Sequence, residues 1–283
     1  TVNFAVLESA RGGLLRAGLG FKHCDIAIVT NVAADHLGLK GIHTVEQLAK
    51  VKGVVPETVL PDGYSILNAN DELVYDMRRN ITSKLALFSM DENNPHIKAL
   101  QRRGGITAIY ENGYVTICRG EWKMRVMKVE DIPLTYGGRA EFMIANVLPA
   151  ILAANIQGIS IEDTKMALET FIPSPSQTPG RLNVFEFKNF TVILDYAHNP
   201  AGMRALQNFT NEFDASVKVG IVAGIGDRRV EDNNEIGGIA AEMFDEIIIR
   251  QDKHLRGRTE EELIGFLNDG IRSIMEWRHR YLH

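Results

Sequence analysis

The stretch TNVAADHLGLKG, residues 30–41, follows the apolar run DIAIVT and ends in glycines. The apolar run is typical of a buried strand, and the glycines allow the chain to turn. Three polar residues stand between them: Asn31, Asp35 and His36. In open α/β sheets, ligands bind beyond the carboxyl ends of the strands, so this position favours a binding site.

Apolar runs and helical patterns alternate through the first half of the chain, which predicts a parallel sheet covered by helices. Residues 106–132 alternate with period two around Asn112-Gly113, which predicts an antiparallel meander. The predicted strands are TVNFAVLE, CDIAIVTN, YSILNAN and KLALFSM, and the predicted helices are TVEQLAKVKGVV, DELVYDMRR, NPHIKALQRR, AEFMIANVLPAILAANIQG and SIEDTKMALETF.

IPSPSQTPG, residues 172–180, is the predicted linker, because three prolines in this stretch cannot continue a helix. Strand and helix patterns resume after it, so a second α/β domain is expected. We place the first domain at residues 1–178 and the second at 179–283.

Composition excludes several classes of protein. The chain has 283 residues, 45% hydrophobic and 24% charged, which is typical of globular domains. The net charge of −5 argues against a nucleic-acid partner, and no apolar run reaches the roughly 18 residues that span a membrane. Cys24 and Cys118 are not in CxxC spacing and indicate ordinary thiols of a cytoplasmic protein. The chain begins inside a strand pattern and stops after a helical one, so a piece of a longer protein is expected.

Other strand patterns also end in polar residues. Glu8 ends TVNFAVLE, and Asp195 and His198 follow TVIL. Each has a structural alternative, since Glu8 could cap a helix or lie in a solvated turn, and Asp195 could form an Asx turn before Pro200. GIGDRR follows VGIVA but lacks the third glycine of a dinucleotide fingerprint. A carboxylate and an imidazole from adjacent strands can share one Mg²⁺.

Six segments resemble, in order, the motifs of the Mur ligase superfamily, and together they cover nearly the whole chain. The resemblance implies a truncated P-loop-type ATPase domain followed by a Rossmann-like α/β C-terminal domain. ARGGLLR, GIGDRR and DKHLRGR are most similar to the Mur-ligase-like half of the cyanophycin synthetases. The six segments are ESARGGLLRAGL, TNVAADHLGLKGI, LAKVKGVV, LNANDE, PGRLNVFE and DYAHNPAGM.

The resemblance implies an ATP- and Mg²⁺-dependent ligase. ATP phosphorylates a carboxylate, and an amine then displaces phosphate from the acyl phosphate. For the cyanophycin synthetases the amine is that of arginine and the acceptor is the β-carboxylate of an aspartate-rich polymer. Two alternatives stay open: a muramyl-peptide or folylpolyglutamate ligase, and a nucleotide-binding module without turnover.

One family motif is absent. The phosphate loop, G-x-x-G-K-[ST], has no counterpart, because no Gly-Lys pair occurs in the sequence. We expect the loop upstream, with an ATP-grasp half before it, and we expect the chain alone to be inactive. A sheet that lacks the strand before the loop has an open edge, so a homo-oligomer is also expected.

The resemblance assigns metal-binding roles to Glu8 and His36, and Asp35 is expected to orient His36. It also implies a carbamoylated lysine that acts as an extra carboxylate near the metal. Lys52 matches the family motif better than Lys50, and the alternative for either is a solvated surface lysine.

Four further residues match the family's nucleotide and substrate contacts. Asn146 matches an asparagine that reads adenine, with a satisfied core amide as its alternative. Arg181 matches an arginine that reaches the ATP phosphates, and Asp195 matches an acid that bonds the ribose. His198 matches a residue near the phosphate and the incoming amino acid, so with Lys52 it is predicted to be catalytic.

Overall fold

The structure is a computed structural model that describes residues 2–35, 37–251 and 255–281, with side chains described as far as Glu276. The chain forms two compact units. The first unit comprises Thr1–Val32, Ile42–Gly138 and Phe142–Phe171, and the second comprises Ala33–Gly41, Arg139–Glu141 and Ile172–His283.

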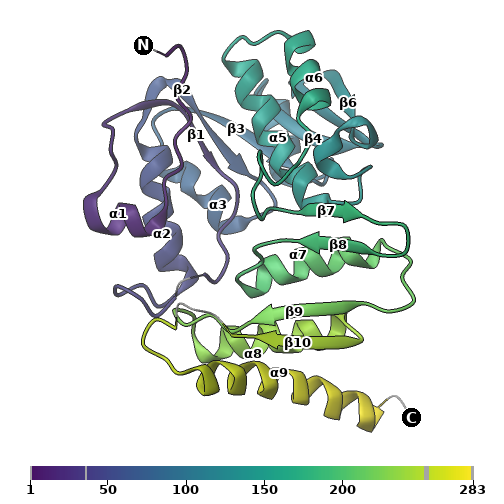
Figure 1. The fold of residues 1–283 in the computed structure, drawn as a ribbon. Helices are drawn as coiled ribbons and strands as arrows, with labels where there is room; N and C mark the ends of the chain where they lie inside the picture. Colours follow the sequence, from purple (N-terminus) through teal and green to yellow (C-terminus); the bar gives the residue numbers. More distant parts are fainter. Residues whose placement is uncertain (1, 36, 252–254, 282–283) are drawn as a thin grey trace. The chain divides into compact units, whose positions relative to one another are not determined.

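The first unit contains a six-stranded sheet in the order β1-β2-β3-β4-β5-β6 (Figure 1). Strands β1 to β4 are parallel, and β4, β5 and β6 form an antiparallel meander, which confirms both predictions. The elements are α1 (Arg11–Ala17), β1 (Cys24–Val29), α2 (Val45–Glu57), β2 (Val59–Asn68), α3 (Glu72–Asp76), β3 (Lys84–Ser89), α4 (Pro95–Arg102), β4 (Ile106–Glu111), β5 (Tyr114–Arg119), β6 (Trp122–Lys128), α5 (Glu141–Ile156) and α6 (Ile161–Thr170).

Helices cover both faces of this sheet. Successive strand residues point to opposite faces, so Ile66 lies in one core and Leu67 in the other. The first core packs against α5 through residues such as Leu148 and Ile151, and the second packs against α2, α3 and α4. The middle strands are therefore buried on both sides, as their near-continuous apolar runs require.

The expectation of a strand at TVNFAVLE is wrong. Residues 2–10 lie in no helix or strand, and Val2, Phe4, Val6 and Leu7 are exposed. A strand forms only when its backbone groups pair with a neighbour, and β1 is the end strand of the sheet. The apolar pattern alone could not supply that neighbour.

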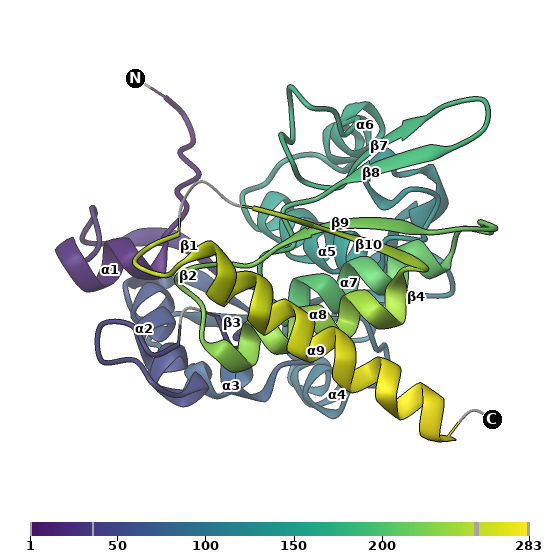
Figure 2. The same ribbon diagram turned by 60° about the horizontal axis from the view of Figure 1, so that its bottom comes forward.

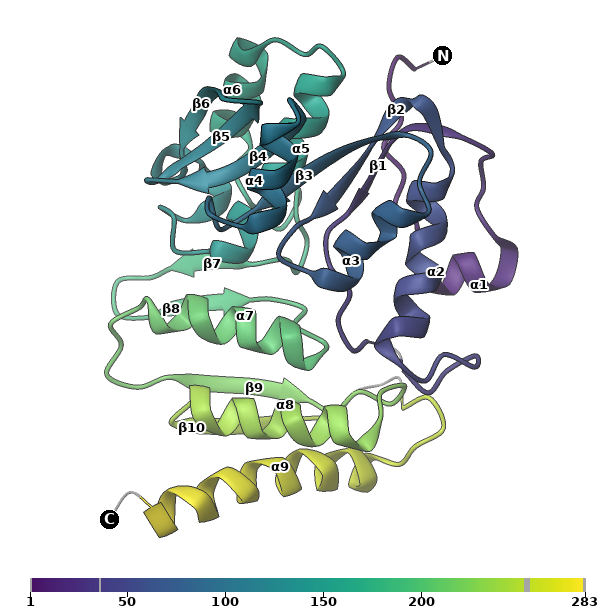
Figure 3. The same cartoon turned by 180° about the vertical axis from the view of Figure 1, so that it is seen from behind.

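The second unit is also α/β. β9 (Val219–Ala223) and β10 (Glu246–Arg250) pair in parallel, and β7 (Asn183–Glu186) and β8 (Thr191–Leu194) form a separate antiparallel hairpin. Helices α7 (Pro200–Asn211) and α8 (Val230–Met243) lie on one face of these strands, as the opposite views of Figures 1 and 3 agree. The helix α9 (Glu260–Tyr281) packs along α8 (Figure 2).

Close backbone contact joins α8 and α9, because glycines face the partner helix. A Cβ atom on Gly237 would lie 2.1 Å from the carbonyl oxygen of Leu267, and one on Gly270 would lie 1.8 Å from that of Asn234. Real Cβ atoms do not approach backbone atoms below 3.0 Å. The helices could accept a side chain at these positions only by moving apart.

We expect Gly237→Ala or Gly270→Ala to lower the free energy of unfolding by about 3 kcal/mol, because overpacking displaces one helix. Gly265→Ala on α9 is the matched control, because nothing lies within 4 Å of its added methyl group. There, alanine should stabilise by about 0.5–1 kcal/mol through helix propensity. Urea denaturation of the three variants measures the free energy of unfolding. Equal changes in that free energy for all three variants would contradict the close-contact explanation.

Both cysteines are ordinary thiols in the structure. Burial raises the pKa of the Cys24 thiol and of the Cys118 thiol, and neither is in a disulfide. Across the part of the chain that the structure describes, no helix is both long and apolar enough to cross a bilayer.

Candidate functional site

The carboxyl end of β1 is held in place by side chains from three other segments of the first unit. They bond three successive residues, Thr30–Val32. Asn68 Nδ2 donates to the Thr30 carbonyl at 2.7 Å. Lys52 Nζ donates to the Asn31 carbonyl at 2.9 Å. Asp71 Oδ2 accepts from the N–H of Val32 at 2.7 Å, while Asp71 Oδ1 caps α3. The chain therefore leaves β1 in a fixed direction.

Asn68 and Asp71 belong to LNANDE, one of the six segments that resemble the family motifs, for which the sequence alone indicates no role. Asn70 of the same motif accepts from the N–H of Met90 at 2.8 Å. The motif thus connects the ends of β1, β2 and β3. Asn and Asp directly after a strand, followed by a helix cap, were the signal that could have indicated this role.

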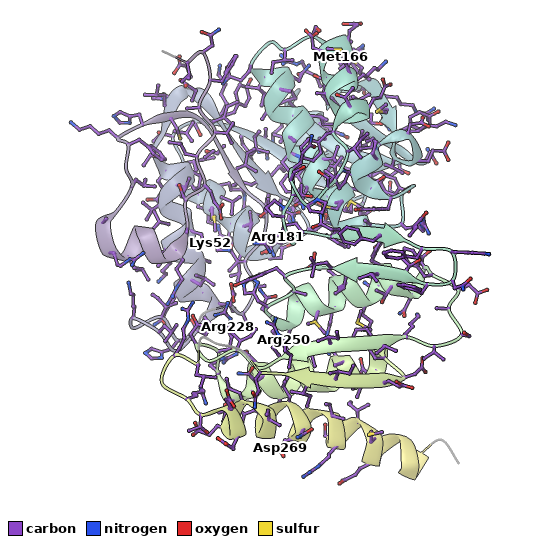
Figure 4. The ribbon with its side chains drawn as sticks, viewed as in Figure 1. Lys52, Met166, Arg181, Arg228, Arg250 and Asp269 are labelled. Atoms are coloured by element: carbon purple, nitrogen blue, oxygen red, sulfur yellow. The ribbon has the colours of Figure 1, made fainter. Side chains whose placement is uncertain are left out.

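The two candidate lysines of α2 have different environments. Lys50 is exposed. Lys52, which is labelled in Figure 4, is half-buried and donates to the Asn31 carbonyl. A carbamoylated lysine keeps one N–H on Nζ, so Lys52 could retain this hydrogen bond and still present a carboxylate. This geometry is compatible with the prediction for Lys52, and the modification itself stays a prediction.

Glu8 is exposed and follows no strand, so the structural reason for its selection does not hold. It lies in the unpaired segment before α1, and it does not cap that helix, whose N-cap residue is Ala10. His36 lies outside the described residues. The convergence of Glu8 and His36 therefore stays a prediction.

Three of the predicted residues lie together in the second unit. Arg181 lies over the Tyr196 ring, with Cζ 4.9 Å from the ring centroid, and the Tyr196 and His198 ring centroids are 4.7 Å apart. Asp195 accepts from the backbone N–H groups of Leu182 and Ala197, both at 2.8 Å. Asp195 thus fixes the chain next to Arg181 and forms the Asx turn of its structural alternative. Each carboxylate oxygen retains capacity for a further hydrogen bond.

Asp35 belongs to the second unit, although it follows β1 in sequence. Its Oδ1 lies 2.9 Å from Nη2 of Arg228, and its Oδ2 lies 3.6 Å from Nε2 of His198. The family resemblance implies that Asp35 orients His36, and it gives no role to Arg228. The Asp35–Arg228 pair joins residues far apart in sequence. The signal for Arg228 in the sequence was its place in the GIGDRR motif.

Asn146 lies on α5, where it is exposed. The alternative of a core amide is therefore wrong. The amide Nδ2 lies 3.8 Å from the Met143 sulfur, a weak contact that leaves the amide accessible to a ligand.

The residues present agree in donor type with Mg²⁺. The cation prefers oxygen ligands and keeps several waters, and an exposed Glu8 carboxylate with a carbamoylated Lys52 would supply such oxygens. Within residues 2–35, 37–251 and 255–281, no group of three or more His, Cys, Asp or Glu side chains is arranged to hold a metal ion.

Comparison with known proteins matches both parts of the chain to one family. Residues 1–154 match the Mur ligase middle domain, and residues 180–278 match the Mur ligase, glutamate ligase domain. A cyanophycin synthetase of Geminocystis herdmanii (strain PCC 6308) is 50% identical over 96% of this chain and 31% of its own length. The chain thus spans about a third of that relative.

Solved structures show the same fold at lower identity. MurF from Acinetobacter baumannii superposes with a TM-score of 0.63 at 19% identity, covering 88% of this chain and 49% of that one. Escherichia coli FolC in complex with ADP superposes with a TM-score of 0.61 at 16% identity, covering 91% of this chain and 56% of that one. With the middle-domain match spanning more than half of its residues, the chain belongs to the Mur ligase family.

Proposed function

We propose that this chain is part of an ATP-dependent ligase that adds arginine to the β-carboxylate of an aspartate-rich polymer through an acyl phosphate. The observation that carries the proposal is the 50% identity to a cyanophycin synthetase over 96% of the chain. Relatives of the muramyl-peptide type are more distant, with 24% identity over 96% of the chain in the diaminopimelate ligase of Caldanaerobacter subterraneus.

The resemblance to the family makes Asn146, Arg181 and Asp195 the proposed contacts of ATP. Arg181 is suited to phosphate oxygens because its guanidinium is a planar fork, and the Tyr196 ring beneath it restricts its orientation. Asp195 can accept from ribose hydroxyls with the lone pairs that the two backbone N–H groups leave. The exposed Asn146 amide offers a donor and an acceptor to the adenine edge.

Glu8, His36 and carbamoylated Lys52 are the proposed Mg²⁺ ligands. When bound, the ion would neutralise charge on the transferred phosphoryl group. The network around Thr30–Val32 supports this role, because it fixes the three residues that precede the segment Ala33–Gly41 and includes Lys52. His198 would act beside the phosphate and the incoming amine, where its contact with Asp35 limits its rotation.

We further propose a cytoplasmic, homo-oligomeric enzyme. Among the described strands β1 is the end strand of its sheet, so its outer edge supports self-association of residues 1–283 in particular, because an open strand edge can pair with another chain.

Phosphate release by the full-length ligase tests the substrate assignment. With Mg²⁺ and ATP, release should require both arginine and an aspartate-rich primer, and mass spectrometry of the primer should show the added arginine. Two matched reactions would replace arginine and the primer. One would contain diaminopimelate and a muramyl dipeptide, and the other would contain glutamate and a folate. Turnover with one of those pairs alone would identify another ligase of the family, and nucleotide binding without turnover would indicate a binding module.

A further inference from the structure

The loop GIGDRR, Gly224–Arg229, follows β9 and has no role in the proposed function. Its conformation is fixed from both ends. The Asn233 side chain is fully buried and bonds the N–H and carbonyl of Ile225 at 2.8 and 3.1 Å and the carbonyl of Arg229 at 3.1 Å. Arg258 donates to two more carbonyls of the loop, at 3.0 and 3.1 Å. The loop therefore presents its side chains from a rigid frame.

Arg228 is the buried cation of this loop, with only 3% of its side chain exposed. Its guanidinium contacts Asp227 Oδ1 at 2.8 Å and Asp35 Oδ1 at 2.9 Å. Asp227 also pairs with Arg256 at 2.6 Å, so its charge is shared between two cations. A buried guanidinium needs compensating carboxylates, and Asp35 supplies one of them from a distant part of the sequence.

The segment that carries Asp35 packs with the second unit in other ways. Leu37 is 5% exposed, and a Cβ added to Gly38 would lie 3.8 Å from Cγ of Arg229. Gly38 has a φ of +83°, which favours glycine and lets the segment turn against the loop. The segment Ala33–Gly41 is thus attached to GIGDRR by the Asp35–Arg228 charge pair and by the close approach of Gly38 to Arg229.

We infer that Arg228 is a positioning residue for the proposed reaction: through Asp35 it fixes both the segment Ala33–Gly41 and the His198 imidazole. Asp35 shares one carboxylate between Arg228 and His198, with Oδ1 on the guanidinium and Oδ2 3.6 Å from Nε2. The proposed metal ligand His36 is the next residue in the sequence, so loss of the Asp35–Arg228 pair is expected to weaken Mg²⁺ binding. The inference rests on the proposed function only for its catalytic consequence.

The test compares Arg228→Gln, Asp35→Asn and the double variant in the full-length ligase. Outer partners of metal-site residues are typically worth about 10–100-fold, so each single variant should lower kcat by that factor and raise the Mg²⁺ concentration that gives half-maximal rate. KM for arginine should change little. Since the two residues act through one contact, the double variant should be no worse than the poorer single variant.

A second measurement needs no substrate. Hydrogen exchange of the amides in residues 33–41 should be at least about tenfold faster in each variant, because the segment loses its attachment. Arg204→Gln is the control, since Arg204 is exposed and pairs with Glu235 and Glu242 in the same unit. It should change neither exchange in this segment nor kcat.

Unchanged exchange in Asp35→Asn, or effects on kcat that multiply in the double variant, would overturn the inference. Should Arg228→Gln fail to fold, Asp35→Asn decides by itself, because Asp35 is 28% exposed and asparagine has nearly its size. Faster exchange together with no arginine ligation by the parent enzyme would reject the proposed function and keep the attachment. Normal hydrogen exchange in the variants of an enzyme that does ligate arginine would reject the attachment and keep the proposed function.

Discussion

Purified residues 1–283 are expected to release phosphate from ATP on the order of 10³–10⁵-fold more slowly than the full-length ligase. A phosphate loop supplies backbone N–H donors, a lysine and a hydroxyl that position the β- and γ-phosphates. No Gly-Lys pair exists in this sequence to take that role. A phosphate-release assay with Mg²⁺, ATP, arginine and an aspartate-rich primer measures the difference.

The comparison requires that the isolated chain is folded. A cooperative thermal transition, and the expected order of stabilities for Gly270→Ala and Gly265→Ala, would establish this independently of activity. Turnover within about tenfold of the full-length ligase would show that the nucleotide site lies elsewhere than proposed.

Lys52→Arg in the full-length ligase is expected to lower kcat about 10²–10³-fold, the usual cost of removing one group that stabilises developing charge. Arginine keeps a cation and can still donate to the Asn31 carbonyl, but it cannot carry a carbamate. Lys50→Arg is the matched control, because Lys50 is exposed on the same helix, and its kcat should stay within about twofold.

Two further measurements distinguish a carbamoylated Lys52 from a lysine that only makes a structural hydrogen bond. Lys52→Ala should be partly rescued by acetate, which can replace the missing carboxylate, and ¹³CO₂ should give a carbamate signal in the unmodified protein but not in Lys52→Arg. If Lys52→Arg retains full activity while Lys52→Ala does not, the hydrogen bond to Asn31 explains the role of Lys52, at a net worth of about 1 kcal/mol.

Local patterns were sufficient for most of the fold. The period-two run at residues 106–132 and the apolar runs of β1 to β3 predicted their strands, because side-chain burial follows the backbone repeat. TVNFAVLE has an equally clear pattern and forms no strand. Strand formation depends on a partner that the pattern of one segment does not contain.

The candidate site divides in the same way. The resemblance to the family's motifs pointed to Lys52, Asn146, Arg181, Asp195 and His198. The contacts of these residues did not follow from order. The bond from Lys52 to Asn31 depends on how α2 packs beside β1, and the Arg181–Tyr196 pair depends on a turn fixed by Asp195.

The sequence by itself determined the family, most of the α/β elements and the list of chemically capable residues, since all three depend on local composition and spacing. Only the tertiary structure decided that Asp35 belongs with the second unit and pairs with Arg228. It likewise decided that Asn68 and Asp71 support the end of β1. The physical reason is that a buried charge or backbone group takes its partner from whichever segment folding brings within hydrogen-bond distance, and sequence separation does not limit that choice.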